Sequence, residues 1–185
     1  MSVAAGQRLL IDLDGVLADF DLGFVRAWQA LGGERPLVAP ATRRHFHLCD
    51  DYPAVWRDAV TATIAQPGFY RQLPPMPGAQ AVLAQLARQG YALTVCTSPG
   101  PSLAERQGWL AEHFGPALAA SMLALADKTL ADGDWLIDDN PHPYGAQPPR
   151  WQHVLFDQPY NRHLPGPRVS WLNWPTHWPP IQTLT

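Results

Sequence analysis

Acidic residues follow two apolar segments that lie far apart in the chain. The first segment leads into Asp12 and Asp14, and the second leads into Asp138 and Asp139. If the fold brings these four carboxylates to one place, they cannot all be ionised without a cation, because like charges oppose one another's ionisation. Carboxylate oxygens are hard ligands of the kind that Mg²⁺ prefers in proteins. The residue types and their pairing therefore predict a Mg²⁺ site.

Two hydroxyls and a lysine could hold an anion beside that cation. Thr97 and Ser98 end another apolar segment, and Lys128, the single lysine among 13 Lys and Arg residues, precedes the second acidic pair. Each feature alone has a simpler interpretation: a helix cap for the hydroxyls, a solvated surface residue for the lysine, and turn chemistry for the acidic pair. Taken together, these residues favour a phosphate site.

A mostly parallel sheet would bring these residues to one edge. Apolar runs punctuated by Gly, Pro or Asp predict strands at 9–11, 91–97, 134–137 and 153–156, with a shorter one at 122–125. Helical spacing of apolar residues is found at 78–89 and 102–114. This alternation predicts a Rossmann-like α/β core whose sheet is covered on both faces. Such sheets bind ligands at the carboxyl ends of their strands.

Residues 17–77 interrupt the alternation. They contain helical patterns at about 19–31 and 53–65, many aromatic residues and no convincing strand. The simplest account is a small helical cap inserted after the first strand. We therefore expect a core made of residues 1–16 and 78–185 and a cap made of residues 17–77.

The segment beyond residue 140 is rich in proline and tryptophan. Interleaved tryptophans indicate a loop-rich segment that packs onto the core rather than a disordered tail. Trp171, Trp174 and Trp178 recur at helical spacing, which favours packing over a ligand site. The same segment is a candidate interface for a homodimer.

The ordered motifs resemble those of the haloacid dehalogenase-like (HAD) phosphohydrolases. That superfamily has an Asp-x-Asp-Gly motif after a strand, then a Ser or Thr that ends a strand, a Lys and an acidic pair. The corresponding residues here are Asp12-Leu13-Asp14-Gly15, Thr97, Lys128 and Asp138-Asp139. Within the superfamily, the chain resembles the 5′(3′)-deoxyribonucleotidases over nearly its whole length. This resemblance is found at residues 11–20, 77–79, 96–99, 114–116, 127–129, 136–139 and 151–156.

The resemblance implies a phosphoryl transfer in two steps. Asp12 would attack phosphorus and form an aspartyl-phosphate. Asp14 would protonate the leaving oxygen and then activate the water that hydrolyses the intermediate. Mg²⁺ would be held by Asp12, by the main-chain carbonyl of Asp14 and by the pair Asp138 and Asp139. The three residues expected to bind the phosphoryl oxygens are Thr97, Ser98 and Lys128.

The resemblance also implies that the cap binds the nucleoside. Phe20 and Phe46 match positions that line the base pocket of the family, and Tyr70 falls where an aromatic residue is expected. Aromatic faces suit a base because they stack on it and exclude water. Each of these rings is equally consistent with a place in the core of the cap.

Three positions depart from the family pattern. His47 stands where the vertebrate enzymes carry a tryptophan, Ala126 replaces an arginine, and Arg106 stands in for a lysine near the phosphate. These departures alter one wall of the expected base pocket and the contacts beside the phosphate. The preferred base, the choice between deoxyribose and ribose, and the choice between 5′ and 3′ esters therefore stay open.

The composition excludes several classes of protein. With 46% hydrophobic and 16% charged residues, the 185-residue chain is not disordered. Its net charge of −3 gives no field for binding nucleic acid or an anionic membrane. No apolar run approaches the ~20 residues of a membrane span, and the first residues lack the pattern of a leader peptide. We therefore expect a cytoplasmic protein in which Cys49 and Cys96 are reduced thiols.

These observations predict a Mg²⁺-dependent phosphatase that converts (deoxy)nucleoside monophosphates to nucleoside and phosphate. Its expected partner is a small nucleotide rather than a nucleic acid. Two alternatives stay open: a phosphatase for another small phosphate monoester, and a catalytically silent nucleotide-binding protein of the same fold. The histidines offer little support for another metal site, because His45 and His47 have no third ligand in register.

Overall fold

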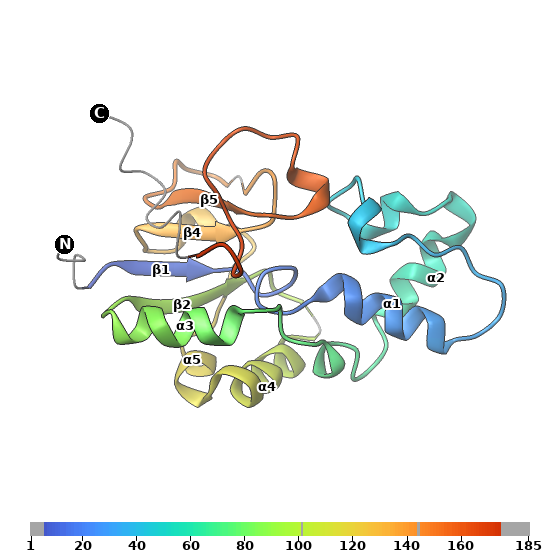
Figure 1. Ribbon diagram of the computed structural model, residues 1–185, viewed down its shortest axis with the longest axis horizontal. Helices are drawn as coiled ribbons and strands as arrows, with labels where there is room; N and C mark the ends of the chain where they lie inside the picture. Colours follow the sequence, from blue (N-terminus) through green and yellow to red (C-terminus); the bar gives the residue numbers. More distant parts are fainter. Residues whose placement is uncertain (1–5, 101, 144, 175–185) are drawn as a thin grey trace.

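A parallel sheet lies at the centre of the core. The computed structural model describes residues 6–100, 102–143 and 145–174. Six parallel strands run in the order β3-β2-β1-β4-β5-β6 (Figure 1). Their bounds are Arg8–Ile11 for β1, Ala92–Thr97 for β2, Leu123–Ala124 for β3, Trp135–Asp138 for β4, Gln152–Phe156 for β5 and Arg168–Val169 for β6. The predicted α/β class is confirmed.

The register of the central strands sets the level at which each one ends. Ile11 of β1 lies opposite Val95 of β2 and Ile137 of β4. The next residue, Asp12, donates its backbone N–H to the carbonyl of Ile137 over 2.9 Å. Asp12, the end of β2 and Asp138 therefore reach the same edge of the sheet, as expected for parallel strands.

Successive strand residues face opposite sides of the sheet, so the sheet separates two hydrophobic cores. Leu9 and Ile11 belong to the main core, together with residues of the helices. The smaller core on the other side consists of Leu10, Cys96, Ala131, Leu136 and Trp151. Among the described residues, those that cover this second side are Ala131, which follows the 3-10 turn at Lys128–Leu130, and Trp151, which directly precedes β5.

The helices after the cap build the main core from their apolar faces. They are α3 (Ala79–Arg88), α4 (Leu103–Phe114) and α5 (Pro116–Ala120). α3 and α5 contact β2, and α4 contributes Trp109 and Leu110 to the main core. α5 was not predicted, because Gly115-Pro116 was interpreted only as the end of α4. Proline at the first position of a helix also starts one, since it has no N–H to leave unpaired.

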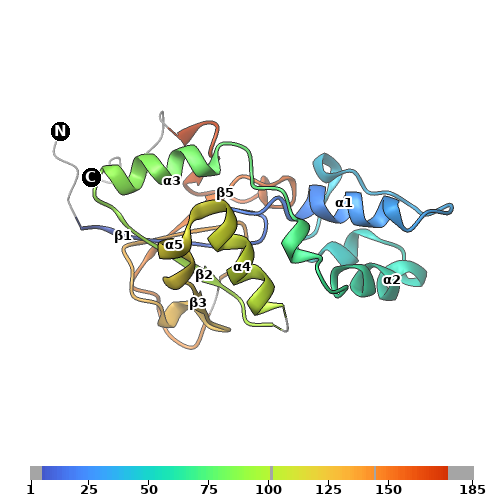
Figure 2. The same cartoon turned by 90° about the horizontal axis from the view of Figure 1, so that it is seen from below.

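Residues 17–77 form the helical segment that the sequence predicts. Its α-helices are α1 (Phe20–Ala30) and α2 (Ala54–Ile64), and its 3-10 turns are η1 (Pro40–Thr42), η2 (Leu48–Asp51) and η3 (Tyr70–Gln72). α1 and α2 pack together beyond the ends of the strands (Figures 1 and 2). The side chain of Asp19 caps α1 by accepting a hydrogen bond from the N–H of Leu22 over 3.0 Å.

Three tryptophans beyond residue 140 pack onto the core. Trp151, Trp171 and Trp174 are all buried. The indole N–H of Trp171 donates to the carbonyl of Val16 over 2.7 Å, which ties the segment to the turn after β1. These three side chains therefore offer no surface for a homodimer interface. Trp178 lies outside the described residues.

Two further expectations concern the thiols and the length of the helices. Cys49 and Cys96 are both free thiols, as predicted. Among the helices in the described parts of the chain, none is both long and apolar enough to span a bilayer.

Candidate active site

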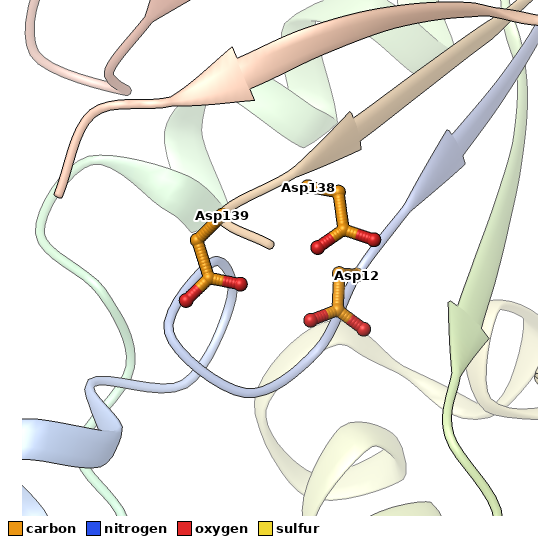
Figure 3. Close-up of side chains that lie close together, drawn as sticks. All are labelled: Asp12, Asp138 and Asp139. Carbon is orange, nitrogen blue, oxygen red and sulfur yellow. The ribbon is translucent and has the colours of Figure 1, made fainter. Parts of the chain in front are cut away.

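Three buried carboxylates meet where β1 and β4 end. Asp12 follows β1, Asp138 is the last residue of β4, and Asp139 comes next (Figure 3). One oxygen from each carboxylate lies within 4.8 Å of the others. The exposed fractions of the three residues are only 8%, 0% and 3%, so water does little to screen their charges. The predicted gathering of these acidic residues is therefore observed.

Lys128 supplies the positive charge closest to this group. Its Nζ lies 2.7 Å from Asp12 Oδ1 and 2.7 Å from Asp138 Oδ2. The 3-10 turn η4 (Lys128–Leu130) positions it, and Asp127 caps that turn by accepting from the N–H of Thr129 over 2.9 Å. Burial alone would lower the pKa of Lys128, but the two carboxylates outweigh it and raise that pKa, so the side chain is an ammonium.

Asp14 is held by a second cation. Its Oδ2 lies 2.7 Å from the guanidinium of Arg106, which is itself buried and lies over the ring of Tyr70 at 4.2 Å. Burial raises the pKa of Asp14 to about 6, although Arg106 acts to lower it. A carboxyl group with this pKa exists in both protonation states near neutral pH, which suits general acid–base catalysis. Arg106 thus lies beside Asp14, and its predicted contact with the phosphate stays a prediction.

We call Asp12, Asp14, Arg106, Lys128, Asp138 and Asp139 the charged cluster. Burial raises the pKa of Asp12 to about 6, against the opposing effect of Lys128. Burial and the neighbouring carboxylates Asp12 and Asp138 raise the pKa of Asp139 well above its usual value. Asp139 Oδ1 is buried and has no hydrogen-bond partner among the described residues. Both observations fit a site for a divalent cation, which would compensate the buried charges.

Gly15 allows the chain to pass close to Asp139. Its φ of +82° lies in the left-handed region that favours glycine. A Cβ atom at this position would also collide with Oδ2 of Asp139. Glycine is therefore required after the two aspartates both for the turn and for the close approach.

The two predicted hydroxyl residues differ in their surroundings. Thr97 is buried as the last residue of β2, one position beyond the level of Asp12. Ser98 is exposed, and its carbonyl accepts a hydrogen bond from Arg106 over 3.3 Å. Ala126 is exposed two residues before Lys128.

A cavity of about 270 Å³ opens beside the charged cluster. Phe20, Phe46, His47 and Tyr70 line it, and we call it the aromatic cavity. Its floor includes Asp14, Gly15 and Asp139, so a ligand in the cavity would touch both regions. The ring centroids of Phe46 and His47 are 5.1 Å apart, and those of Phe20 and Tyr70 are 6.4 Å apart.

Several residues of this cavity were not predicted from the sequence. Asp21, Arg43 and Tyr160 also line it, and all three are buried. Arg43 and Tyr160 come from distant parts of the chain but are in contact, with the guanidinium 4.5 Å from the ring centroid. The available signal for Tyr160 was its place just after the predicted strand 153–156, at the edge where the other polar residues gather.

Comparison with known sequences places this site in a family. Residues 7–176 match the family described as "5' nucleotidase, deoxy (Pyrimidine), cytosolic type C protein". The chain belongs to this family. Members of this family are phosphoric monoester hydrolases, and so is this chain. The resemblance to the 5′(3′)-deoxyribonucleotidases predicted from the motifs is confirmed.

Relatives with assigned names align with nearly the whole chain. A predicted 5′(3′)-deoxyribonucleotidase of Bordetella pertussis is 40% identical over 171 residues, which cover 90% of this chain and 92% of that protein. The mitochondrial 5′(3′)-deoxyribonucleotidase of Mus musculus is 36% identical, covering 94% of this chain and 84% of that protein. The cytosolic type of Homo sapiens is 35% identical, covering 95% and 93% respectively.

Solved structures show the fold. A haloacid dehalogenase-like family hydrolase from Streptococcus pneumoniae superposes with a TM-score of 0.61 at 12% sequence identity. The likeness covers 91% of this chain and 95% of that chain. The Rossmann-like HAD architecture expected from the motifs is thus confirmed.

Proposed function

We propose that the protein is a Mg²⁺-dependent phosphatase of nucleoside monophosphates, with deoxyribonucleotides as its leading substrates. The observation that supports this most strongly is that the aromatic cavity and the charged cluster share Asp14 and Asp139. A nucleotide has a flat apolar base joined to a charged phosphate, and this cavity offers a surface for each part. The deoxyribonucleotidases named among the relatives support the same substrate class.

Asp12, Asp138, Asp139 and the main-chain carbonyl of Asp14 are the groups that would hold Mg²⁺. The buried and unpaired Oδ1 of Asp139, with two further carboxylates close by, is the feature that fits a cation. When bound, the metal would neutralise charge on the phosphoryl group and reduce its repulsion of the nucleophile.

Asp12 is the nucleophile in this proposal. One carboxylate oxygen forms a bond to phosphorus while the bond from phosphorus to the ester oxygen breaks, which leaves an aspartyl-phosphate and the nucleoside. Lys128 holds Asp12 Oδ1 at 2.7 Å, which leaves Oδ2 of Asp12 to attack. The same ammonium, with Thr97 and Ser98, would bind phosphoryl oxygens and stabilise the charge that develops on them.

Asp14 is the general acid and base. It donates a proton to the leaving ester oxygen, and then accepts a proton from the water that attacks the aspartyl-phosphate. Its pKa of about 6 allows both directions of transfer near neutral pH. Arg106 holds one of its oxygens at 2.7 Å and so orients the carboxyl group.

Residues 17–77 act as a cap in this proposal and residues 1–16 and 78–185 as the core. The cap supplies Phe20, Phe46, His47 and Tyr70 to the aromatic cavity, while Asp14 and Asp139 come from the core. Closing the cap over a nucleotide would exclude water from the reacting phosphate.

Asp12→Asn tests the proposed chemistry directly. Phosphate release from dTMP should depend on Mg²⁺, stop when the metal is chelated, and fall at least about 10³-fold in the variant. Asp132→Asn is the matched control, because Asp132 is a surface carboxylate with a 63% exposed side chain. Hydrolysis that survives Asp12→Asn in the presence of Mg²⁺ would show that the nucleophile is another residue. A wild-type chain that binds dTMP without hydrolysing it would be a silent nucleotide-binding protein.

A further inference from the structure

Tyr160 makes a direct contact with the acidic group, although it follows a different strand. It lies in the 3-10 turn η5 (Pro159–Asn161) after β5, is only 4% exposed, and donates its hydroxyl hydrogen to Asp139 Oδ2. The next residue, Asn161, donates to the carbonyls of Asp139 and Phe156 over 2.9 and 2.8 Å. The turn is therefore tied to both the side chain and the backbone of Asp139.

The Tyr160 contact determines which oxygen of Asp139 is available. Each oxygen of Asp138 accepts one hydrogen bond, Oδ1 from the N–H of Asn140 over 2.8 Å and Oδ2 from Lys128 over 2.7 Å, and keeps a further lone pair for a cation. Asp139 has Oδ2 occupied by Tyr160, while Oδ1 is buried with no partner among the described residues. Tyr160 thus leaves a single oxygen of Asp139 free to bind a cation.

The ring of Tyr160 is in turn held by the helical segment. The guanidinium of Arg43 lies 4.5 Å from the ring centroid, and the ring of Phe46 lies 6.0 Å away. Arg43 is itself fixed by Asp21 and Asp51, at 2.5 and 3.2 Å. The turns η1 and η5 also contact each other. A continuous set of contacts therefore runs from the cap through Tyr160 to Asp139.

We propose that Tyr160 is a positioning residue for the metal, that it acts by orienting the carboxylate of Asp139, and that Arg43 fixes its ring from the cap. The inference rests on the metal site of the proposed function. A donor bound to a ligating carboxylate restricts its rotation, and loss of such a donor typically weakens metal binding by about 10- to 100-fold. Removal of the hydroxyl should therefore weaken metal binding without removing any ligand.

The test is the binding of Mn²⁺ alone to the full metal-free chain, measured by titration calorimetry without any nucleotide. Tyr160→Phe keeps the ring under Arg43 and removes only the hydroxyl, so the dissociation constant should rise about tenfold. Tyr91→Phe is the matched control, because Tyr91 is also buried but lies at the other end of β2 from the charged cluster. Its dissociation constant should stay within about twofold of the wild type.

A second measurement separates positioning from a general structural role. The Mg²⁺ concentration that gives half-maximal activity should rise in Tyr160→Phe, while kcat at saturating Mg²⁺ should return to within about threefold of the wild type. A folded Tyr160→Phe variant with the wild-type dissociation constant for Mn²⁺ would overturn the inference and leave the proposed function intact. A wild-type chain that binds no Mn²⁺ would instead remove the metal from the proposed function, and the inference with it.

Arg43→Lys keeps the test decisive if Tyr160→Phe does not fold. Lysine retains the charge that Asp21 and Asp51 require but lacks the planar group that lies over Tyr160. The dissociation constant for Mn²⁺ should then rise about threefold. An unchanged constant in folded Arg43→Lys would contradict the proposal that the cap acts on the metal site through Tyr160.

Discussion

The charged cluster and the aromatic cavity share Asp14 and Asp139, yet they are built in different ways. In the cluster, Lys128 and Arg106 hold three aspartates through contacts of 2.7 Å. Asp12 directly follows β1, Asp14 lies three residues beyond the end of β1, and Asp138 is the last residue of β4. In the cavity, rings pack against one another, with centroids 5.1 Å apart for Phe46 and His47 and 6.4 Å apart for Phe20 and Tyr70. The charged cluster is therefore held by short ion pairs, whereas the rings of the aromatic cavity are held by packing.

In the comparison of these two regions, Lys128→Arg should have a large effect on activity, and it tests how strictly the cluster depends on geometry. The two carboxylates beside Nζ suit a compact ammonium, and the planar guanidinium cannot take the same position between them. We expect kcat to fall about 10²-fold or more, because the charge that stabilises the phosphoryl group is displaced. The melting temperature should change by less than about 5 °C.

Arg162→Lys is the control for this exchange of cations. Arg162 pairs with Asp157 at 2.8 Å on the surface, and its side chain is 60% exposed. Its replacement should leave kcat within about twofold of the wild type. A near-wild-type rate in Lys128→Arg would show that the cluster tolerates either cation. Activity would then depend no more on the exact geometry of the cluster than on that of the cavity.

Phe46→Ala should have a smaller effect, and on only one class of substrate. Removal of one ring from the aromatic cavity should raise KM for dTMP by about two- to tenfold, since an aromatic contact contributes about 0.5–1.5 kcal/mol. KM for a sugar phosphate, which has no aromatic ring, should change much less, because its phosphate would be held by the charged cluster. Steady-state kinetics on both substrates give the comparison. Phe114→Ala, which removes a half-buried ring far from the cavity, is the control.

The Phe46→Ala variant can also show that the charged cluster and the aromatic cavity are not functionally separate. An equal loss for dTMP and for the sugar phosphate in Phe46→Ala would mean that the ring supports the cluster rather than the base. Phe46 would then belong functionally with Tyr160, whose ring centroid lies 6.0 Å away.

A separate prediction concerns folding stability in acid rather than activity, at a residue close to the charged cluster. Burial lowers the pKa of His153 to about 4 from its ordinary 6.5. Between these values the unfolded chain binds the proton and the folded chain does not, so folding stability is lost as pH falls through this window. His153→Gln removes this contribution. From pH 7 to pH 4.5, the wild type should lose about 2 kcal/mol more than the variant in the free energy of unfolding.

Chemical denaturation at each pH measures that difference. His163→Gln is the control, because His163 is exposed and the replacement should leave the acid response unchanged. Equal acid sensitivity of the wild type and His153→Gln would show that His153 takes up its proton equally in the folded and unfolded chains.

The charged cluster was predictable because its residues stand beside strong local signals. Asp12 and Asp138 end apolar runs of strand length, and parallel strands bring such ends to one edge. Lys128 and Thr97 followed from their order along the chain, which the family resemblance supports. The helices within residues 17–77 were predictable for a similar reason, since this segment shows helical spacing without strand patterns.

The contacts between the cap and the core were not predictable. Arg43 and Tyr160 are far apart in sequence, and no local pattern pairs a guanidinium with one particular ring. β6 consists of two residues, too few to show the alternation that indicates a strand. The burial of Trp151, Trp171 and Trp174 was not predictable either, since a tryptophan-rich sequence does not reveal whether its rings face inward or outward.

The most direct test of the whole account is the ratio of kcat/KM values for different phosphate esters with Mg²⁺ present. If the aromatic cavity binds a base while the charged cluster transfers the phosphoryl group, dUMP or dTMP should exceed p-nitrophenyl phosphate and a sugar phosphate by about tenfold or more. Values for dUMP and dTMP no higher than those for the two simple esters would contradict the nucleotide assignment and indicate a phosphatase for another small phosphate monoester.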